Sequence, residues 1–369
     1  MAKGGEGGFD LALFGEPSEA RQAVDGPVHV LNTGGTISHA APEEGGATLT
    51  YSPDRILAEL GGEAGAPGGI VYREILRKGS VSMAPADWQA IAAAVYEAVR
   101  AGAGGVVVLH GTDTMAYTAP ALSFMLAGLP VPVAITGSML AGGRPDSDGR
   151  RNLRDALRVA AAGDLAEVCV VFSGDAAGSR GVILRGNRTR KRDSGALDAF
   201  ASPNHPALGT VHGAAIRYDA ADRVPRGRRG DPALRAEIDP RVVLLRYHPG
   251  WTPPFVEECL GRAEGAVIEG TGLGHLPPEG GILEAIAASG KPVVLVTQCW
   301  QGGVRHGMYD IDRPILAVPN LIPGHDLTPE AALTKLMWVL GRERAAAGVR
   351  LLMQRPLAGE LTPPPGAGA

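Results

Sequence analysis

Two stretches of sequence indicate the fold: VHVLNTGGTI at residues 28–37 and VVVLHGTDTM at residues 106–115. Each begins as a continuous apolar run, which is typical of a strand buried on both faces of a parallel sheet. Each then turns through glycine and threonine, and glycine permits tight turns and the close approach of a ligand. Ligands of open parallel sheets bind at the carboxyl ends of strands, near a topological switch point. The pair therefore predicts two halves of one active site, although either turn alone fits simple hydroxyl capping equally well.

Apolar runs and amphipathic segments alternate outward from these stretches, which favours an α/β fold with a parallel sheet. In the first half, strands are expected at 28–32, 70–76, 105–109, 131–136 and 167–173, and helices at 53–60, 85–101, 116–127 and 150–161. In the second half, strands are expected at 242–247, 265–269 and 292–297, and helices at 254–262, 281–288, 329–340 and 344–353.

The length of 369 residues exceeds what one hydrophobic core usually supports, so two domains are expected. Residues 214–238 interrupt the alternation with prolines, glycines and charges. We place there a linker between an N-terminal catalytic α/β domain at 27–213 and a C-terminal α/β domain at 239–361. Residues 1–26 are expected to form a flexible extension, and residues 362–369 a disordered tail.

Charge and cysteine content narrow the function classes. The formal net charge of −4 does not resemble the electrostatic footprint of a nucleic-acid binder. Cys169, Cys259 and Cys299 are widely separated, so neither a zinc site nor a redox motif is supported. Cys169 and Cys299 lie in apolar runs and are expected to be buried thiols. No signal-peptide core or membrane-length apolar run is present, which indicates a cytoplasmic protein without a membrane partner.

The ordered motifs of this chain resemble those of the bacterial-type L-asparaginases. TGGTI at 33–37 and HGTDTM at 110–115 are similar to the two signatures of that family. The likeness continues through TGSM at 136–139, RPDSDG at 144–149, RGNRTRK at 185–191 and DAFASPN at 198–204, and it covers about residues 27–361. The resemblance implies two α/β domains, a larger N-terminal one with a flavodoxin-like parallel sheet and flanking helices, and a smaller C-terminal one.

The resemblance also implies hydrolysis of the L-asparagine side-chain amide to L-aspartate and ammonia, without metal or cofactor. Thr36 is implied as the nucleophile, which forms an acyl-enzyme. Thr112, Asp113 and Lys191 resemble the family's second hydroxyl–carboxylate–amine group. As a base, Lys191 would need its pKa lowered from about 10.4 toward 7, by desolvation or by a cation among the arginines at 185–192. A Lys191 that stays charged would instead stabilise the transition state electrostatically.

Further residues match the family's substrate-binding positions. Tyr51 matches a lid tyrosine that orients the first threonine. Ser80, with backbone N–H groups, is implied to bind the substrate α-carboxylate, and Asp113 the α-ammonium. Val81 stands where some members carry a polar amide that helps to bind the amino group. His275 stands where many members have asparagine, and it would either contact substrate across a dimer interface or line that interface.

The expected partners are a small-molecule substrate, L-asparagine or also L-glutamine, and further copies of the chain in a dimer or dimer of dimers. The choice between the two amides stays open, because one methylene changes discrimination by only ~1–3 kcal/mol.

Two other functions are weighed. IEGTGLGH at 268–275 and KLMWVLG at 335–341 are also similar to the D subunit of archaeal glutamyl-tRNA(Gln) amidotransferase, which releases ammonia for a partner enzyme. That subunit carries an extra domain before the first threonine motif, and about 30 residues are too few for one. A non-catalytic amino-acid-binding α/β protein is the other alternative, although a binder has little need of a nucleophile.

Overall fold

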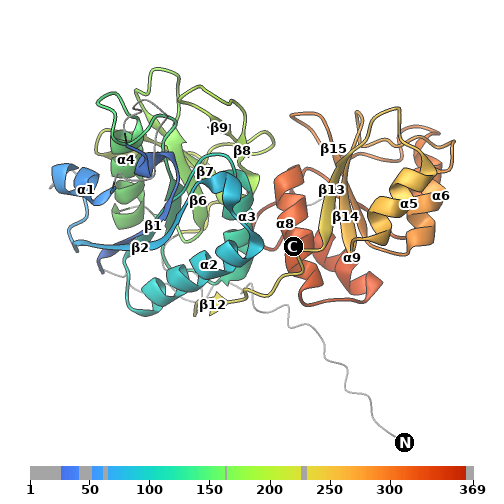
Figure 1. The fold of residues 1–369 in the computed structure, drawn as a ribbon, viewed down its shortest axis with the longest axis horizontal. Coiled ribbons are helices and arrows are strands. Elements are labelled where there is room, and N and C mark those ends of the chain that lie inside the picture. Colours follow the sequence, from blue (N-terminus) through green and yellow to red (C-terminus); the bar gives the residue numbers. More distant parts are fainter. Residues whose placement is uncertain (1–25, 41–51, 61–64, 163, 226–230, 363–369) are drawn as a thin grey trace, which may run out of the picture.

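The computed structural model describes residues 26–40, 52–60, 65–162, 164–225 and 231–362. It consists of two α/β domains that lie side by side (Figure 1). Tyr51, the N-terminal extension up to residue 25 and the tail from residue 363 lie outside the described residues.

The sheet of the N-terminal domain has eight strands in the order β11-β10-β7-β6-β5-β3-β1-β2. Its parallel part consists of β2 (Ile70–Lys78), β1 (Val28–Gly34), β3 (Gly105–Leu109), β5 (Val133–Thr136) and β6 (Val168–Ser173). Its antiparallel part consists of β7 (Gly181–Arg185), β10 (Gly209–His212) and β11 (Ala215–Tyr218). The parallel order confirms the expected flavodoxin-like sheet, and its switch point lies between β1 and β3.

Helices cover both faces of this sheet. One face carries α2 (Pro85–Arg100) and α3 (Met115–Met125), and the other carries α1 (Asp54–Leu60) and α4 (Gly149–Ala162). Side chains of a strand alternate between faces, so Val106 and Val108 pack toward α2 and α3, whereas Val107 and Leu109 pack toward α4. Burial on both faces explains why β3 and β6 appear as continuous apolar runs.

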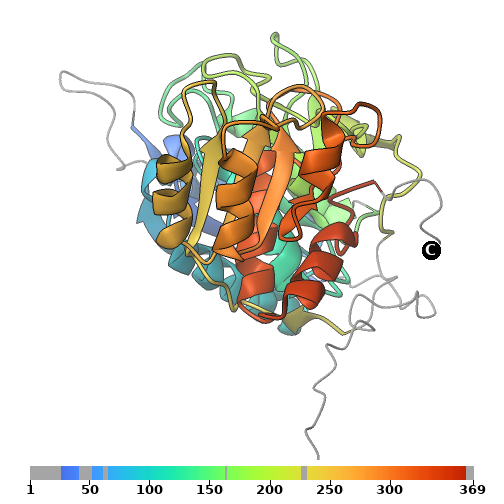
Figure 2. The same ribbon diagram turned by 90° about the vertical axis from the view of Figure 1, so that its right-hand side faces the viewer.

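The smaller sheet lies in the C-terminal domain and is parallel throughout. Its strands, in spatial order, are β13 (Val242–Arg246), β14 (Gly265–Gly270), β15 (Val293–Thr297) and β16 (Leu321–Pro323). One face packs on α5 (Pro253–Gly261), α6 (Ile282–Ser289) and α7 (Asp312–Leu316), and the other on α8 (Pro329–Leu340) and α9 (Ala346–Gln354). Figure 2 looks onto this domain and shows the gold and orange helices α5 and α6 in front of the strands.

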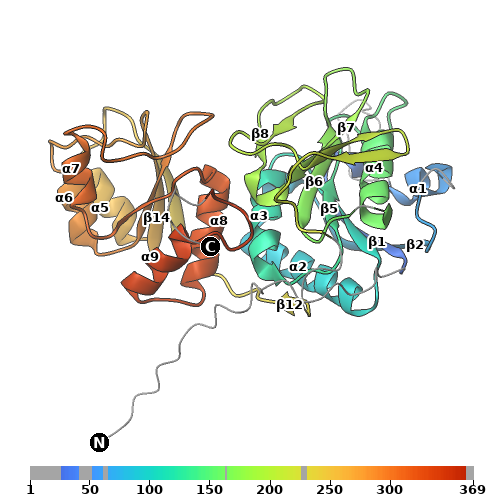
Figure 3. The same cartoon turned by 180° about the vertical axis from the view of Figure 1, so that it is seen from behind.

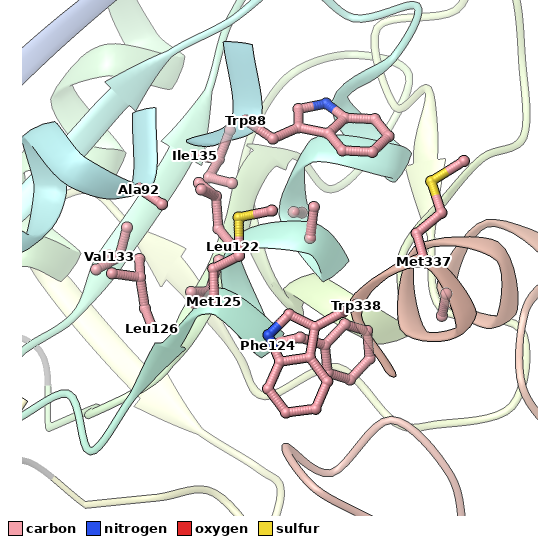
Figure 4. Close-up of a cluster of buried hydrophobic side chains, with 14 of the residues drawn as sticks. Trp88, Ala92, Leu122, Phe124, Met125, Leu126, Val133, Ile135, Met337 and Trp338 are labelled. Atoms are coloured by element: carbon pink, nitrogen blue, oxygen red, sulfur yellow. The ribbon is translucent and has the colours of Figure 1, made fainter. Parts of the chain in front are cut away.

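Helix α8 lies between the two domains, beside α3 (Figure 3). Every residue of α8 is buried. The rings of Phe124 in α3 and Trp338 in α8 have centroids 6.3 Å apart (Figure 4). Trp88 and Met337 belong to the same apolar cluster, so one core continues from the N-terminal sheet to the C-terminal sheet.

The structure differs from the expectations in short elements. Helix α3 ends at Met125, because Leu126–Ala127 (β4) pairs antiparallel with Ala233–Leu234 (β12). Residues 214–238, expected to be a linker, contain β12 and also β11, which forms the edge of the larger sheet. The β4–β12 pairing joins segments far apart in the chain, whereas β11 forms a local hairpin with β10. These strands are only two to four residues long, which is too short to leave a periodic signal in the sequence.

Cysteine placement is partly as expected. Cys169 is buried in β6, and burial raises the pKa of its thiol. Cys299 is exposed just beyond β15, so the expectation that it is buried is wrong. The apolar run ends at Thr297, and the chain turns to the surface there. None of the helices within the described ranges has the length and apolar character needed to cross a bilayer.

Candidate active site

The turns after β1 and β3 are in direct contact. Gly35 has φ +81°, and a Cβ built on it would lie 2.3 Å from the backbone nitrogen of Gly111. Only glycine allows both this left-handed backbone and this approach. Thr33 Oγ1 also donates a hydrogen bond of 2.8 Å to the carbonyl of Leu109. The two threonine-bearing turns therefore form one surface at the switch point of the sheet.

A third turn joins them from β2. Ser80 begins a short 3₁₀ helix (Ser80–Ser82), and its Oγ accepts a hydrogen bond of 3.1 Å from the backbone nitrogen of Asp113. Thr114 Oγ1 donates 2.8 Å to the Ser80 carbonyl. Thr114 is the N-cap residue of α3, yet its side chain makes no capping bond. The hydroxyl-cap interpretation therefore fails at Thr114, whose side chain links two turns instead.

Lys191 reaches this surface from a distant part of the chain. It lies in β8 (Arg190–Lys191), which pairs with β9 (Phe200–Ala201). Its Nζ donates to Thr112 Oγ1 at 2.8 Å and to Asp113 Oδ1 at 2.8 Å. The Lys191 side chain is 19% exposed and that of Asp113 is 64% exposed. The structure thus brings together Thr112, Asp113 and Lys191 at the mouth of the site.

Thr36 begins the 3₁₀ helix that follows Gly35 (Thr36–Ser38) and is half-buried. Its carbonyl accepts a hydrogen bond of 3.1 Å from Gly142. Asn32 Oδ1 braces the turn by accepting from Gly34 N at 3.0 Å and from Ser38 Oγ at 3.2 Å. Thr36 therefore stands on a fixed turn one residue from the Gly35–Gly111 contact. Tyr51, its expected orienting partner, is outside the described residues.

The buried His110 ring is neutral, and it is hydrogen-bonded to the turn that carries Thr112. Its Nδ1 lies 2.7 Å from the Gly111 carbonyl, and its Nε2 lies 2.9 Å from Thr118 Oγ1. A carbonyl only accepts, so Nδ1 carries the hydrogen and Nε2 accepts from Thr118. Burial lowers the pKa of His110 to about 4. The motif alone gave no signal that this histidine is structural and uncharged.

The four arginines around Lys191 are engaged by other acceptors. Arg185 bonds to Glu167 and Asp222, Arg188 to Asp326, Arg190 to Glu330, and Arg192 to Asp198. Each of these arginines, considered above as candidate cations near Lys191, has a carboxylate acceptor of its own. The basic run is instead a series of ion pairs that tie this segment to its surroundings.

His275 lies in the C-terminal domain, whereas Val81 lies in the Ser80 turn beside Asp113. His275 belongs to the loop after β14, and its Nε2 is 3.0 Å from Oδ1 of the buried Asp312. Backbone hydrogen bonds from residues 307–309 and the nearby His275 lower the pKa of Asp312. His275 is thus oriented within its own domain. Val81 sits in the Ser80 turn with 78% of its surface exposed.

Across the described part of the chain, no cluster of three or more His, Cys, Asp or Glu residues is arranged to hold a metal ion.

Two family models match the chain: asparaginase, N-terminal, over residues 27–223, and glutaminase/asparaginase C-terminal domain over residues 241–353. L-asparaginase of Thermococcus kodakarensis is 40% identical over 337 residues, 90% of this chain and 98% of that protein. The solved structure of the thermostable L-asparaginase from that organism matches with a TM-score of 0.81 over 91% of this chain and 99% of that one. L-asparaginase I from Vibrio cholerae matches with a TM-score of 0.79 at 32% identity, over 91% and 98% of the two chains. The D subunit of glutamyl-tRNA(Gln) amidotransferase from Methanosarcina mazei is 38% identical over 98% of this chain and 85% of that protein.

Proposed function

Since the chain belongs to the asparaginase family, we propose that it hydrolyses the side-chain amide of L-asparagine to L-aspartate and ammonia. The observation that carries this proposal is the pair of 2.8 Å hydrogen bonds from Lys191 Nζ to Thr112 and Asp113, beside the Gly35–Gly111 contact. Thr36 follows Gly35 and Thr112 follows Gly111, so the contact between the two glycines supports a site that also includes the Thr36 hydroxyl.

In the proposed reaction, Thr36 Oγ1 attacks the carboxamide carbon. The new C–O bond replaces the C–N bond, and ammonia leaves with the proton that the Thr36 hydroxyl gives up. Water then attacks the acyl-enzyme, and its proton returns to Thr36 as aspartate is released. The Lys191–Thr112 hydrogen bond supports a role for both groups in moving the proton and in stabilising negative charge as it develops.

Asp113 and Ser80 are proposed to hold the amino-acid end of the substrate. Asp113 Oδ1 accepts the hydrogen bond from Lys191, so Oδ2 is the oxygen that would accept from the α-ammonium group. Ser80 Oγ accepts from Asp113 N, so its own hydrogen can be donated to an α-carboxylate. Val81 supplies no polar group in this turn, so we expect a weaker hold on the amino group than in relatives with an amide there.

Ammonia release by the purified chain tests the proposal. Wild type should release ammonia from L-asparagine in the presence of a chelator, and Thr36→Ala and Thr112→Ala should each lose most turnover while melting like wild type. Thr210→Ala, in β10 next to the edge strand β11 and far from β1 and β3 in the sheet order, is the matched control and should keep full activity. Because such groups act as a unit, the double variant should lose far less than the product of the single losses. Near-normal turnover in either single variant would remove that threonine from the mechanism.

A second candidate follows from the amidotransferase relatives, which are 36–38% identical over 91–98% of this chain in archaea such as Aeropyrum pernix and Methanosarcina mazei. In this alternative the same site would release ammonia for a partner enzyme. Robust asparagine hydrolysis by the chain alone favours the first proposal. Ammonia release that needs a tRNA-binding partner would favour the second.

We also propose that the chain assembles as a homodimer or dimer of dimers and acts in the cytoplasm. The assembly proposal rests on the family resemblance and on His275, which is oriented by Asp312 in a loop of the C-terminal domain. Light scattering on purified protein measures the assembly, and a monomer at micromolar concentration would refute it. Cell fractionation measures the location.

A further inference from the structure

The strand that carries Lys191 is too short to fix the position of the Lys191 amine by itself. Strand β8 has only two residues, and its ladder consists of the pairs Lys191–Phe200 and Arg190–Ala201. The residues before it form a single 3₁₀ turn, Gly186–Arg188. Beside the ion pairs of the flanking Arg190 and Arg192, the placement of Nζ within 2.8 Å of Thr112 and Asp113 depends on what fixes this turn.

Arg188 fixes the turn to the C-terminal domain. Its side chain is 2% exposed, and Nη1 donates to Asp326 Oδ2 at 2.8 Å. Nε donates to the Gly359 carbonyl at 2.8 Å, and Nη2 donates to Thr362 Oγ1 at 3.3 Å. Asn187 adds a bond of 2.8 Å to the Ala358 carbonyl. All of these acceptors lie more than 130 residues further along the chain.

The segment that receives Arg188 is itself held rigidly. Glu360 and Lys335 form an ion pair of 2.5 Å, and both side chains are fully buried. Glu360 also accepts from the backbone nitrogens of Leu357 and Ala358, and Lys335 donates to the carbonyl of Arg355. Lys335 belongs to α8, the helix buried between the domains. Residues 355–362 are thereby fastened to the most buried helix of the molecule.

We propose that Arg188 is a positioning residue for Lys191, through which the C-terminal segment 355–362 sets the place of the amine in the active site. The inference rests on the proposed function. Arginine suits this role because its planar fork engages three acceptors at once, whereas lysine offers a single point charge on a flexible stem. A shift of about 1 Å in a reacting group can reduce a rate about 100-fold, so a loosened turn should affect turnover rather than binding.

Arg188→Lys tests the proposal because it keeps the charge and loses the fork. We expect kcat to fall about 10- to 100-fold with KM changed less than about threefold. Arg342→Lys is the matched control: Arg342 bonds to Glu237 and packs over the Trp338 ring, and both partners lie outside the Gly186–Arg188 turn, β8 and segment 355–362. The control should keep kcat even if its melting temperature falls. An unchanged kcat in Arg188→Lys, or an equal loss in the control, would overturn the proposal.

A second readout does not need catalysis. The chain has five lysines, so brief acylation of the native protein followed by peptide mass mapping resolves Lys191 individually. Loss of the Arg188 fork should raise the acylation rate of Lys191 several-fold and leave Lys291 unchanged. If wild type releases no ammonia, the proposed function fails, while this rate still decides whether Arg188 holds the amine.

Asp326→Asn provides an independent variant should Arg188→Lys fail to fold. It keeps the shape of the acceptor and removes its charge, while Arg188 itself stays. The same pattern is expected in milder form: lower kcat, nearly constant KM and faster acylation of Lys191. Wild-type values of both kcat and the acylation rate would refute the positioning role.

Discussion

The contact between Gly35 and Gly111 gives a sharp test of whether the two turns must touch. In Gly35→Ala, the added Cβ would lie 2.3 Å from the nitrogen and 2.4 Å from the Cα of Gly111. Ordinary van der Waals contact begins near 3.4 Å, so the turns must separate by about 1 Å. The neighbours are backbone atoms, which cannot rotate away as a side chain could.

Two effects contribute to the expected magnitude. Gly35 has φ +81° and ψ −175°, a region that is essentially confined to glycine, so alanine there costs ~1–3 kcal/mol in backbone strain. Misplacement of Thr36 against Thr112 by about 1 Å should reduce kcat about 100-fold, equivalent to about 3 kcal/mol of transition-state stabilisation. The first effect lowers the free energy of unfolding, and the second lowers turnover.

Gly102→Ala separates these effects. Gly102 has φ +88°, close to that of Gly35, but nothing lies within 4 Å of a Cβ built there. Both variants should lose stability in urea unfolding, Gly35→Ala the more because its Cβ also clashes with Gly111. A coupled ammonia assay should show normal kcat only in Gly102→Ala. If Gly35→Ala turns over within about threefold of Gly102→Ala, contact between the turns is not required, and the reasoning fails.

Three further predictions concern His110, Glu360 and Ser80. The pKa of His110 is about 4 in the folded protein, below its ordinary value of 6.5. As the pH falls, the unfolded chain therefore takes up a proton at His110 before the folded protein does. The free energy of unfolding should then fall by about 2 kcal/mol between pH 7 and pH 5. His110→Gln should lose this part of the pH dependence in urea unfolding, and an unchanged slope would contradict it. Glu360→Gln leaves Lys335 charged and unpaired in the core, so it should reduce the free energy of unfolding by about 3–5 kcal/mol, and Lys335→Met in the same chain should restore part of it. Ser80→Ala should raise KM for asparagine about tenfold with a smaller effect on kcat, and a loss confined to kcat would argue against a binding role.

The strands and the two turns were predictable because their physics is local. Runs such as Val106–Leu109 are apolar since both faces of the sheet are covered, and a glycine–threonine turn at the end of such a run marks the ligand-binding edge. The order of the parallel strands followed from the family resemblance rather than from these runs.

The ion pairs of residues 185–190 were not predictable. A run of arginines indicates a solvated loop, and nothing local shows that Arg188 and Arg190 are bound by Asp326 and Glu330, 138 and 140 residues away. The pairing of β4 with β12 was missed for the same reason. In each case the partner is set by tertiary packing, which leaves no periodic trace in the sequence.

Helix α8 has a consequence for how substrate reaches the site. Because Trp338 of α8 packs on Phe124 of α3 within one continuous apolar cluster, separating the two domains would expose that face of α8 to water. Exposing apolar surface in this way costs free energy in proportion to its area. We therefore expect small molecules to enter and leave the site past segments at the rim of the larger sheet, with the two domains kept in contact.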